Sequence, residues 1–520
     1  MRFVNSNVKI SVSQFDINRA HFGGGALHIK HSILNLIGSN FHSNTATGGG
    51  AMVLVTSSNT LIKESQFDNN SATLSGGDYE KDIIKIFGVR YYSIVKNIAG
   101  ALLILNSNVT INGPSAGSSH SSCATRYTDN KADWGAALWV RNGTVKIYDF
   151  LTVNGSVANE YAAIYMEDSS GEFLGTTIIS NNIGSFVTLN SDIILLGRTL
   201  FVNCSPSLIS LARAKEGGAI TSFQSSLVFS GECMMKKNHA VNGRAILASE
   251  TKLHVNANLT IENNTAMKYG GGIQLYHSEL NCQRKSNLKI MGNNAAKKGG
   301  GVHAVSSLIM VMYSETLVFH YVQSRLQTQV SSISTGQLKF IENKSEKGGG
   351  MYLEANVKLH VLKSATTYHG SYRINGTDHP TTTKIQFISN KAEYGAAIFV
   401  DDDTYTATCA INERAECFVQ VITPHTYGRE LTFLKDDVRH LEFIQNHAGV
   451  SGSTLFGGLL DRCNLSPFTE FNASVYHGIT YLKKISTTIN LKSISSDPLR
   501  VCFCVNNHPN CSYHAGLKSY

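Results

Sequence analysis

Apolar and polar residues alternate over short stretches of this chain, and many of these stretches follow a pair of glycines or alanines. Ala26-Leu-His-Ile29 and Ala397-Ile-Phe-Val400 are two examples. Alternation with a period of two is typical of β-strands, because successive side chains point to opposite faces. Gly suits a corner that needs a positive φ or a close approach of two backbones. We therefore expect an all-β chain in which a tight corner precedes each strand.

A longer pattern, Phe-x-x-Asn-x-Ala-x-x-Gly-Gly-Ala, connects these stretches in imperfect copies. The first copies begin at Phe15, Phe41 and Phe67, which are 26 residues apart. Later copies have their Asn at Asn130, Asn238, Asn264, Asn294, Asn343, Asn390 and Asn446. A period in the twenties fits one coil of a solenoid, whereas a propeller blade needs roughly 40–45 residues. The sequence therefore predicts a right-handed parallel β-helix.

Each position of the motif has a predicted role in such a coil. The Phe should point inward and stack on its equivalents in neighbouring coils. Asn suits a turn, since it tolerates the left-handed conformation and its amide bonds local backbone. Identical Asn residues in stacked coils can also form a hydrogen-bonded ladder along the axis. Gly-rich stretches such as Gly23-Gly-Gly25 recur with the coil period, so we interpret them as corners and not as phosphate-binding loops.

The copies divide the chain into two predicted regions. Residues 1–456 should form the β-helix, with segments 79–96, 165–212 and 304–336 fitting the motif poorly. We expect loops or an excursion at 304–336, and loop insertions after Asn294. Residues 457–520 are predicted to be a small Cys-containing cap, or a junction to a further C-terminal region.

Composition and charge narrow the class of protein. Only 16% of residues are charged and the net charge is +8, without a run of five or more Lys or Arg. This distribution lacks the basic patch of a nucleic-acid binder, so no nucleic-acid partner is predicted. An ordinary, mildly basic solvated surface is the first interpretation, and a preference for anionic glycans or lipid headgroups is the alternative.

The N-terminal sequence Met1-Arg-Phe-Val-Asn lacks the apolar segment of a signal peptide, and no apolar stretch reaches the roughly 18 residues of a membrane span. Because the chain starts within a coil, we expect a fragment of a longer protein. Any membrane association would then depend on segments outside this sequence.

Ten Cys and twelve Asn-x-Ser/Thr sequons favour an oxidising, secretory compartment. The candidate glycosylation sites are Asn69, Asn108, Asn142, Asn154, Asn203, Asn258, Asn263, Asn343, Asn375, Asn464, Asn472 and Asn510. The candidate disulfide cysteines are Cys204, Cys233, Cys409, Cys417, Cys463, Cys502, Cys504 and Cys511. Cys409 and Cys417 would close a small loop, and Cys204 and Cys233 lie about one coil apart, so a bond between coils is a hypothesis. Connectivity does not follow from sequence.

Several of these segments carry a family resemblance. The Phe-x-x-Asn and Gly-Gly-Ala-Ile pairing is similar to the repeats of chlamydial polymorphic outer-membrane proteins. Over nearly the whole chain, the sequence resembles uncharacterised right-handed β-helix surface proteins of sponges and other early-branching animals. The carrying segments are Gly348-Gly-Gly-Met-Tyr-Leu-Glu354, Tyr394-Gly-Ala-Ala-Ile-Phe-Val-Asp-Asp402, Gly457-Gly-Leu-Leu-Asp-Arg-Cys463 and Arg500-Val-Cys-Phe-Cys504. The resemblance implies an extracellular, membrane-associated protein of unassigned molecular function.

Few residues are candidates for chemistry. Asp401, Asp402 and Asp403 follow a predicted strand and could bind Ca²⁺ or serve as acid and base on a polysaccharide. An acidic loop start is the more ordinary interpretation. Cys502, Cys504 and Cys511 with His508 and His514 could hold Zn²⁺, but disulfides suit an extracellular chain better. No catalytic residue, resident metal or cofactor is predicted.

We therefore expect a non-enzymatic extracellular or cell-surface scaffold for adhesion or recognition, with glycans or cell-surface proteins as partners. One alternative is a polysaccharide lyase or hydrolase on a pectate-lyase-like β-helix, for which acidic and basic side chains should gather near Asp401. Another alternative is a structural part of a larger membrane protein with no site of its own.

Overall fold

The computed structural model describes most of the chain from Met1 to Tyr520. The residues that it does not describe are 22, 58, 73–98, 113–124, 149, 160–161, 185, 205–217, 244, 284, 323–324, 355–356, 364–366, 370–384, 402–416, 422–430, 435–440, 452–454, 457–500, 504–511 and 515–520. The described residues form strands, turns and bends without a helix, so no described helix could cross a membrane. The chain divides into two compact units, Met1–Thr251 and Lys252–Tyr520.

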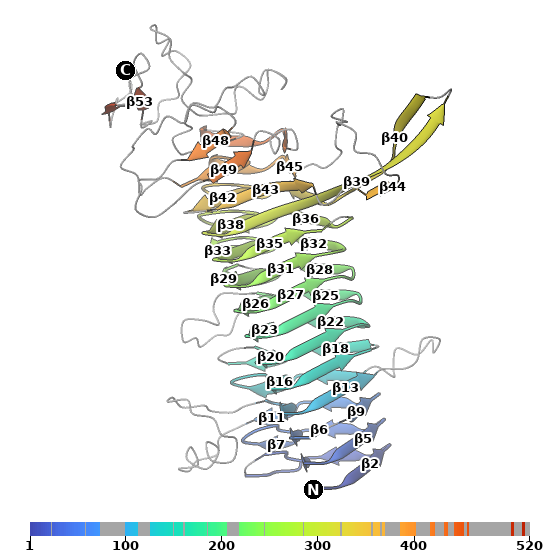
Figure 1. Cartoon of the computed structure of the whole chain (residues 1–520). Coiled ribbons are helices and arrows are strands. Elements are labelled where there is room, and N and C mark those ends of the chain that lie inside the picture. Colours follow the sequence, from blue (N-terminus) through green and yellow to red (C-terminus); the bar gives the residue numbers. More distant parts are fainter. Residues whose placement is uncertain are drawn as a thin grey trace. The chain divides into compact units, whose positions relative to one another are not determined.

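Unit 1 is a parallel β-helix in which each coil adds one strand to each of three sheets (Figure 1). Sheet A contains β1 (Arg2–Val4), β4 (Leu27–Lys30), β8 (Met52–Val55), β12 (Leu102–Leu105), β16 (Leu138–Arg141), β20 (Ile164–Glu167), β23 (Phe186–Leu189), β26 (Ile220–Phe223) and β30 (Ile246–Ser249). Sheet B contains β2 (Asn7–Ser11), β5 (Ile33–Ile37), β9 (Thr60–Lys63), β13 (Asn108–Asn112), β17 (Thr144–Ile147), β21 (Ser170–Phe173), β24 (Asp192–Leu195) and β27 (Ser226–Phe229). Sheet C contains β3 (Gln14–Asp16), β6 (Asn40–His42), β10 (Gln66–Asp68), β14 (Thr125–Thr128), β18 (Phe150–Asn154), β22 (Thr176–Ser180), β25 (Thr199–Val202) and β28 (Cys233–Lys236).

Short strands follow sheet C in several of these coils. They are β7 (Thr45–Ala46), β11 (Ser71–Ala72), β15 (Lys131–Ala132), β19 (Val157–Ala158) and β29 (His239–Asn242). The first four of them pair as a narrow fourth sheet.

Unit 2 repeats the same order of sheets. Its sheet A strands are β34 (Ile273–Tyr276), β38 (Val302–Val305), β42 (Met351–Glu354), β47 (Ile398–Val400) and β52 (Leu455–Phe456). Its sheet B strands are β31 (Lys252–Val255), β35 (Glu279–Cys282), β39 (Leu308–Val322), β40 (Arg325–Thr335), β43 (Lys358–Lys363) and β44 (Thr367–His369). Its sheet C strands are β32 (Asn258–Glu262), β36 (Asn287–Met291), β41 (Gln337–Ile341), β45 (Ile385–Ile388) and β50 (Leu441–Ile444).

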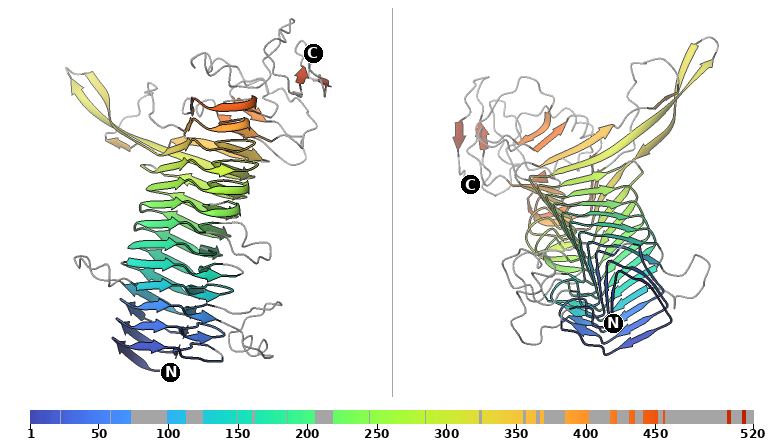
Figure 2. Two further views of the ribbon diagram at one scale, coloured as in Figure 1. Left: turned by 180° about the vertical axis from the view of Figure 1, so that it is seen from behind. Right: turned by 60° about the horizontal axis from the view of Figure 1, so that its bottom comes forward.

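The remaining strands of unit 2 form pairs. The parallel pairs are β33 (Thr265–Tyr269) with β37 (Asn294–Ala295), and β46 (Lys391–Tyr394) with β51 (His447–Ser451). The antiparallel pairs are β48 (Cys417–Val421) with β49 (Leu431–Leu434), and β53 (Val501–Phe503) with β54 (Ser512–His514). Parallel stacking within each unit confirms the predicted β-helix. Figure 2 shows the coils from behind and in a view turned so that the bottom comes forward.

The motif Phe residues stack inside the coils, as predicted. The ring centroids of Phe15 and Phe41 are 4.7 Å apart, those of Phe41 and Phe67 are 4.8 Å apart, and Tyr127 continues the stack at 4.8 Å. Phe340 and Phe387 stack at 4.8 Å in unit 2. These distances match the spacing of neighbouring strands, so the rings follow the coil repeat.

The predicted Asn ladder is also confirmed. In unit 1, Asn18 donates to Asn44 at 2.8 Å, Asn44 to Asn70 at 2.9 Å and Asn70 to Asn130 at 3.2 Å. In unit 2 the ladder runs from Asn264 through Asn293, Asn343 and Asn390 to Asn446. The assignment of Asn294 to this position was wrong, because Asn293 is the ladder residue and Asn294 is exposed.

The left-handed conformation belongs to the residue before the ladder Asn, and not to the ladder Asn itself. Ser43 and Asn69 have φ values of 54° and 50°, whereas the φ values of Asn44 and Asn70 are not positive. Both the left-handed turn and the hydrogen bonds between coils were expected of the motif Asn, but two consecutive residues provide them. One residue turns the chain, and the next uses its amide for hydrogen bonds between coils.

Glycines form the opposite corner because a side chain would not fit there. Gly24 has a φ of +66°. At Gly50 the φ is ordinary, but an added Cβ would collide with the carbonyl oxygen of Gly100 in the neighbouring coil. The glycine-rich stretches are therefore corners, as predicted.

The poorly fitting segments have different outcomes. Segment 165–212 fits the motif poorly in sequence, but β20 to β25 continue all three sheets through Val202, and residues 205–212 lie outside the described residues. One coil is shorter there, since Ser169 bonds to Ser191 across 22 residues, and the next is longer, since Ser191 bonds to Ser225 across 34 residues. Cys204 occupies a ladder position in this segment, and its backbone amide donates to Asn238. Segment 79–96 and residues 457–500 lie outside the described residues. At 304–336 the expected excursion is confirmed: β39 continues beyond its parallel pairing with β35, and its second half pairs antiparallel with β40 (Figure 1).

Candidate functional site

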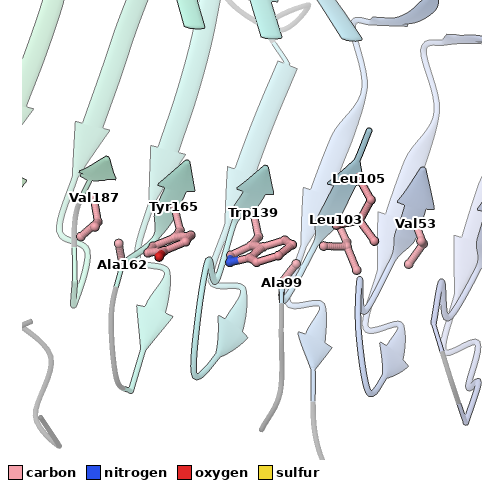
Figure 3. Packing of buried hydrophobic residues seen from close by; sticks show 8 residues of the cluster. All are labelled: Val53, Ala99, Leu103, Leu105, Trp139, Ala162, Tyr165 and Val187. Carbon is pink, nitrogen blue, oxygen red and sulfur yellow. The ribbon is translucent and has the colours of Figure 1, made fainter. Parts of the chain in front are cut away.

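The second residue of the sheet A strands points away from the coil interior, and in unit 1 it is apolar from β8 to β23, whereas β4 and β26 have His28 and Thr221 at this position. Val53, Leu103, Trp139, Tyr165 and Val187 form one row along the sheet (Figure 3). None of the five is more than 5% exposed. Trp139 and Tyr165 stack with a centroid distance of 6.1 Å. This row is a packed apolar face, without groups for chemistry.

In unit 2 the equivalent row is polar and aromatic. Gln274, His303, Tyr352 and Phe399 occupy the second strand position in successive coils. All four are buried. The fourth position adds Glu354, and Asp401 follows β47 beside it, with its amide donating to the Leu353 carbonyl at 2.9 Å. The strand register therefore brings together residues from coils that are far apart in sequence.

A lysine from the preceding corner completes this group. The Nζ of Lys298 lies 3.3 Å from Oε2 of Glu354 and 3.2 Å from Oδ2 of Asp401. It also lies 4.5 Å from the centroid of the Tyr352 ring, within reach of a cation–π interaction. The hydroxyl of Tyr352 donates to Oδ2 of Asp401. We call Lys298, His303, Tyr352, Glu354 and Asp401 the Lys298 cluster.

His303 is held in a single protonation state within this cluster. The amide nitrogen of Gln274 lies 3.2 Å from Nδ1 of His303, and Oε2 of Glu354 lies 3.3 Å from Nε2. An amide nitrogen only donates, so Nδ1 accepts and Nε2 carries the proton toward Glu354. Burial lowers the pKa of His303, although the hydrogen bond to Glu354 opposes that shift. The neutral ring is therefore the resting form.

The two charged partners are also fixed. The hydrogen bond from His303 lowers the pKa of Glu354 to about 2, and the charge of Lys298 lowers it further. Partial burial acts in the opposite direction and raises the pKa, but it does not outweigh these two effects. Burial lowers the pKa of Lys298, but the carboxylates of Glu354 and Asp401 outweigh it and the net shift is upward. Efficient proton transfer near neutral pH needs a group whose pKa lies near the working pH. Glu354 and Lys298 are shifted away from that range.

The geometry does not favour the hypothesis that Asp401, Asp402 and Asp403 form a Ca²⁺ site. Asp401 accepts hydrogen bonds from Lys298 and Tyr352, and its side chain is 11% exposed. A Ca²⁺ site gathers several oxygen ligands, whereas this carboxylate is already neutralised by an ammonium group. Asp402 and Asp403 lie outside the described residues, and within the described part no group of three metal-binding side chains occurs.

The cysteine hypothesis is corrected for one pair. Cys204 and Cys233 are buried free thiols, as is Cys282, and burial raises the pKa of all three. Cys233 pairs with Thr199 in the strand register, whereas Cys204 bonds to Asn238. The two cysteines are thus offset by several residues on neighbouring coils, and the bond between them does not form. The side chains of Cys409, Cys417, Cys463, Cys502, Cys504 and Cys511 lie outside the described part of the chain.

The described sequons differ in accessibility. Six are exposed, namely Asn69, Asn108, Asn142, Asn203, Asn258 and Asn263. Asn154 is half-buried. Asn343 is fully buried in the ladder, where its amide nitrogen donates to Ile290 and Asn390, so it is not an acceptor for a glycan in the folded chain. Asn375, Asn464, Asn472 and Asn510 lie outside the described residues.

Sequence reasoning placed Asp401 among the candidates but missed Lys298, His303 and Glu354. The available signal was the second strand position, which is apolar from β8 to β23 in unit 1 and is occupied by Gln274 and His303 in unit 2. Only the register shows that Glu354 and Asp401 are neighbours, because 47 residues separate them in sequence. Comparison with known proteins adds no relative: no family model matches the chain, and no curated protein or solved structure shows significant similarity to it.

Proposed function

We propose that this chain is a non-enzymatic recognition scaffold of the cell surface or extracellular space. The observation that carries the proposal is the state of the Lys298 cluster, the most elaborate polar group among the described residues. Its ammonium and Glu354 carboxylate are held in their charged forms, and its imidazole is held neutral. Such fixed charges suit binding and packing better than proton transfer.

The solenoid itself supports a recognition role. Each coil adds one copy of every position to a lateral face, at a spacing of about 4.8 Å. A ligand with its own repeat can therefore contact several coils in the same way. Exposed sequons on both units agree with the proposed extracellular location.

The alternative function is a polysaccharide lyase or hydrolase. The observation that favours it is the convergence of Glu354 and Asp401 on the ammonium of Lys298. Paired carboxylates are the usual machinery of glycoside hydrolysis. In that reaction one carboxyl must be protonated as the general acid, whereas the pKa of Glu354 is lowered to about 2. Because Glu354 is held as a carboxylate, it does not suit the role of general acid, and we therefore favour binding over hydrolysis.

The two functions separate in one experiment. The full chain is incubated with neutral and acidic polysaccharides, and both retention on the immobilised polymer and release of new reducing ends or unsaturated products are measured. We expect retention without chain cleavage. Cleavage that disappears in both Glu354→Gln and Asp401→Asn would establish the enzyme instead, with Glu172→Gln on sheet B as the matched control.

A further inference from the structure

One corner of unit 2 carries an exposed polar or charged side chain in each of several successive coils. Asn294, Lys344, Lys391 and His447 are aligned by strand pairing, and all four are exposed. Two positions further along, Glu346 and Glu393 are exposed as well. We call Lys344, Lys391, His447, Glu346 and Glu393 the lysine corner.

This corner is hollowed because small residues lie between the two charged columns. Ala295, Ser345 and Ala392 occupy the middle position, and Gly449 lies two positions after His447. Together with the charged residues they line an open depression. The small side chains leave room for a ligand that runs along the coil axis, with cations on one side and carboxylates on the other.

The lysines of this corner differ from Lys298 because their ammonium groups are available to bind an anionic ligand. Neither Lys344 nor Lys391 forms an ion pair with a described residue, whereas Lys298 is held by two carboxylates. Lys268 and Lys297, in the coils before Lys344, are also exposed. Cations therefore outnumber carboxylates along this corner, and the local potential favours an anion.

We propose that the lysine corner binds a linear acidic polysaccharide, a refinement that rests on the proposed recognition function. Adjacent cations in the column are separated by one strand spacing, about 4.8 Å, which is close to the rise of one sugar ring. Sulfate or carboxylate groups on successive sugars then meet Lys344 and Lys391. The carboxylates of Glu346 and Glu393 accept hydrogen bonds from sugar hydroxyls, which an acidic polysaccharide has in excess.

The lining of the depression argues against two other polyanions. Single-stranded nucleic acid is usually bound with aromatic side chains that stack on its bases, and the described lining residues include no Phe, Tyr or Trp. A polyglutamate segment has few hydroxyl donors for Glu346 and Glu393, so these carboxylates would repel it. A sugar chain uses both columns.

The test measures the affinity of the full chain for heparin, alginate, neutral dextran, polyglutamate and single-stranded DNA at increasing salt. The informative variant is Lys344→Gln with Lys391→Gln. The matched control is Lys289→Gln with Lys339→Gln, a pair on adjacent coils of sheet C in the same unit. We expect a loss of about three- to tenfold for heparin and alginate in the first variant, and little change in the control. Salt should weaken the wild type more steeply than the first variant.

Each other outcome has a distinct meaning. Equal losses in both double variants, or no loss in either, overturn the assignment to the lysine corner. Preference for polyglutamate or DNA overturns the choice of polysaccharide. Binding to dextran alone would support the recognition function but overturn the proposal that the ligand is acidic. Cleavage of any polymer would contradict the recognition function itself.

Discussion

The Nε2 atom of His303 lies 3.3 Å from Oε2 of Glu354, while Gln274 donates to the other nitrogen of the same ring. Hydrogen bonds therefore run in one direction across three neighbouring strands, from Gln274 to His303 to Glu354. The chain of donors ends on a carboxylate and stabilises its charged form. This relationship depends on strand register, since the three residues come from different coils.

The lowered pKa of Glu354 predicts an acid-sensitive contribution to stability. The folded pKa is about 2, compared with an ordinary value of 4.5. The unfolded chain takes up the proton first as pH falls, so this contribution is present above pH 4.5 and is lost as pH falls toward 2. Because the Glu354 side chain is 39% exposed, we expect about 1 kcal/mol after screening.

Urea unfolding of the wild type and Glu354→Gln at neutral and acidic pH measures this term. The wild type should lose more free energy of unfolding than the variant over that range. Glu172→Gln, which removes a half-buried partner of Lys146, should keep the wild-type pH dependence. An unchanged acid slope in Glu354→Gln would contradict the assignment.

Asn70→Ala should strongly destabilise unit 1. The side chain of Asn70 donates to the Phe41 carbonyl at 2.9 Å and to Asn130, and accepts from the amide groups of Asn44. Its removal leaves buried polar groups without partners, at a cost of about 3 kcal/mol. The neighbouring Asn69 is exposed and has a φ of 50°. Asn69→Gly should be nearly neutral in the same thermal unfolding measurement, since Gly adopts this conformation without strain.

Tyr127→Phe should stabilise the protein. Tyr127 replaces a Phe in the stack, and its phenol oxygen is buried without a hydrogen-bond partner among the described residues. Burial raises the pKa of this phenol. Removing the hydroxyl relieves a desolvation penalty of about 1 kcal/mol and keeps the stacked ring. A lower melting temperature in the variant would show that the hydroxyl has a partner that contributes to the fold.

Glycan occupancy tests the proposed location together with the ladder. When the chain is secreted from eukaryotic cells behind an added signal peptide, Asn69, Asn142 and Asn263 should be glycosylated in peptide maps. Asn343 should remain unmodified, because its amide nitrogen is buried and bonded to Asn390. Modified Asn343 in folded protein would contradict the ladder in unit 2.

Sequence could predict the coil because its signals are local and repeated. Phe41 and Asn44 recur after one full coil as Phe67 and Asn70, so inward stacking and the ladder follow from spacing. The one-residue difference between Asn293 and Asn294 was not predictable, since both are Asn and only strand pairing distinguishes them. The Lys298 cluster was missed for the same reason. Loop insertions of unequal length separate Lys298, Glu354 and Asp401, and their convergence depends on register.

The bond between Asn70 and Asn130 joins residues 60 positions apart, although other steps of this ladder span 26. Lengthening the connection from 26 to 60 residues raises the closure entropy by only about 0.7 kcal/mol. The coils on either side keep their partners despite the added sequence. The solenoid can therefore acquire or exchange whole segments at its corners during evolution while its interior stays unchanged, and the same corners are natural sites for grafting a foreign peptide.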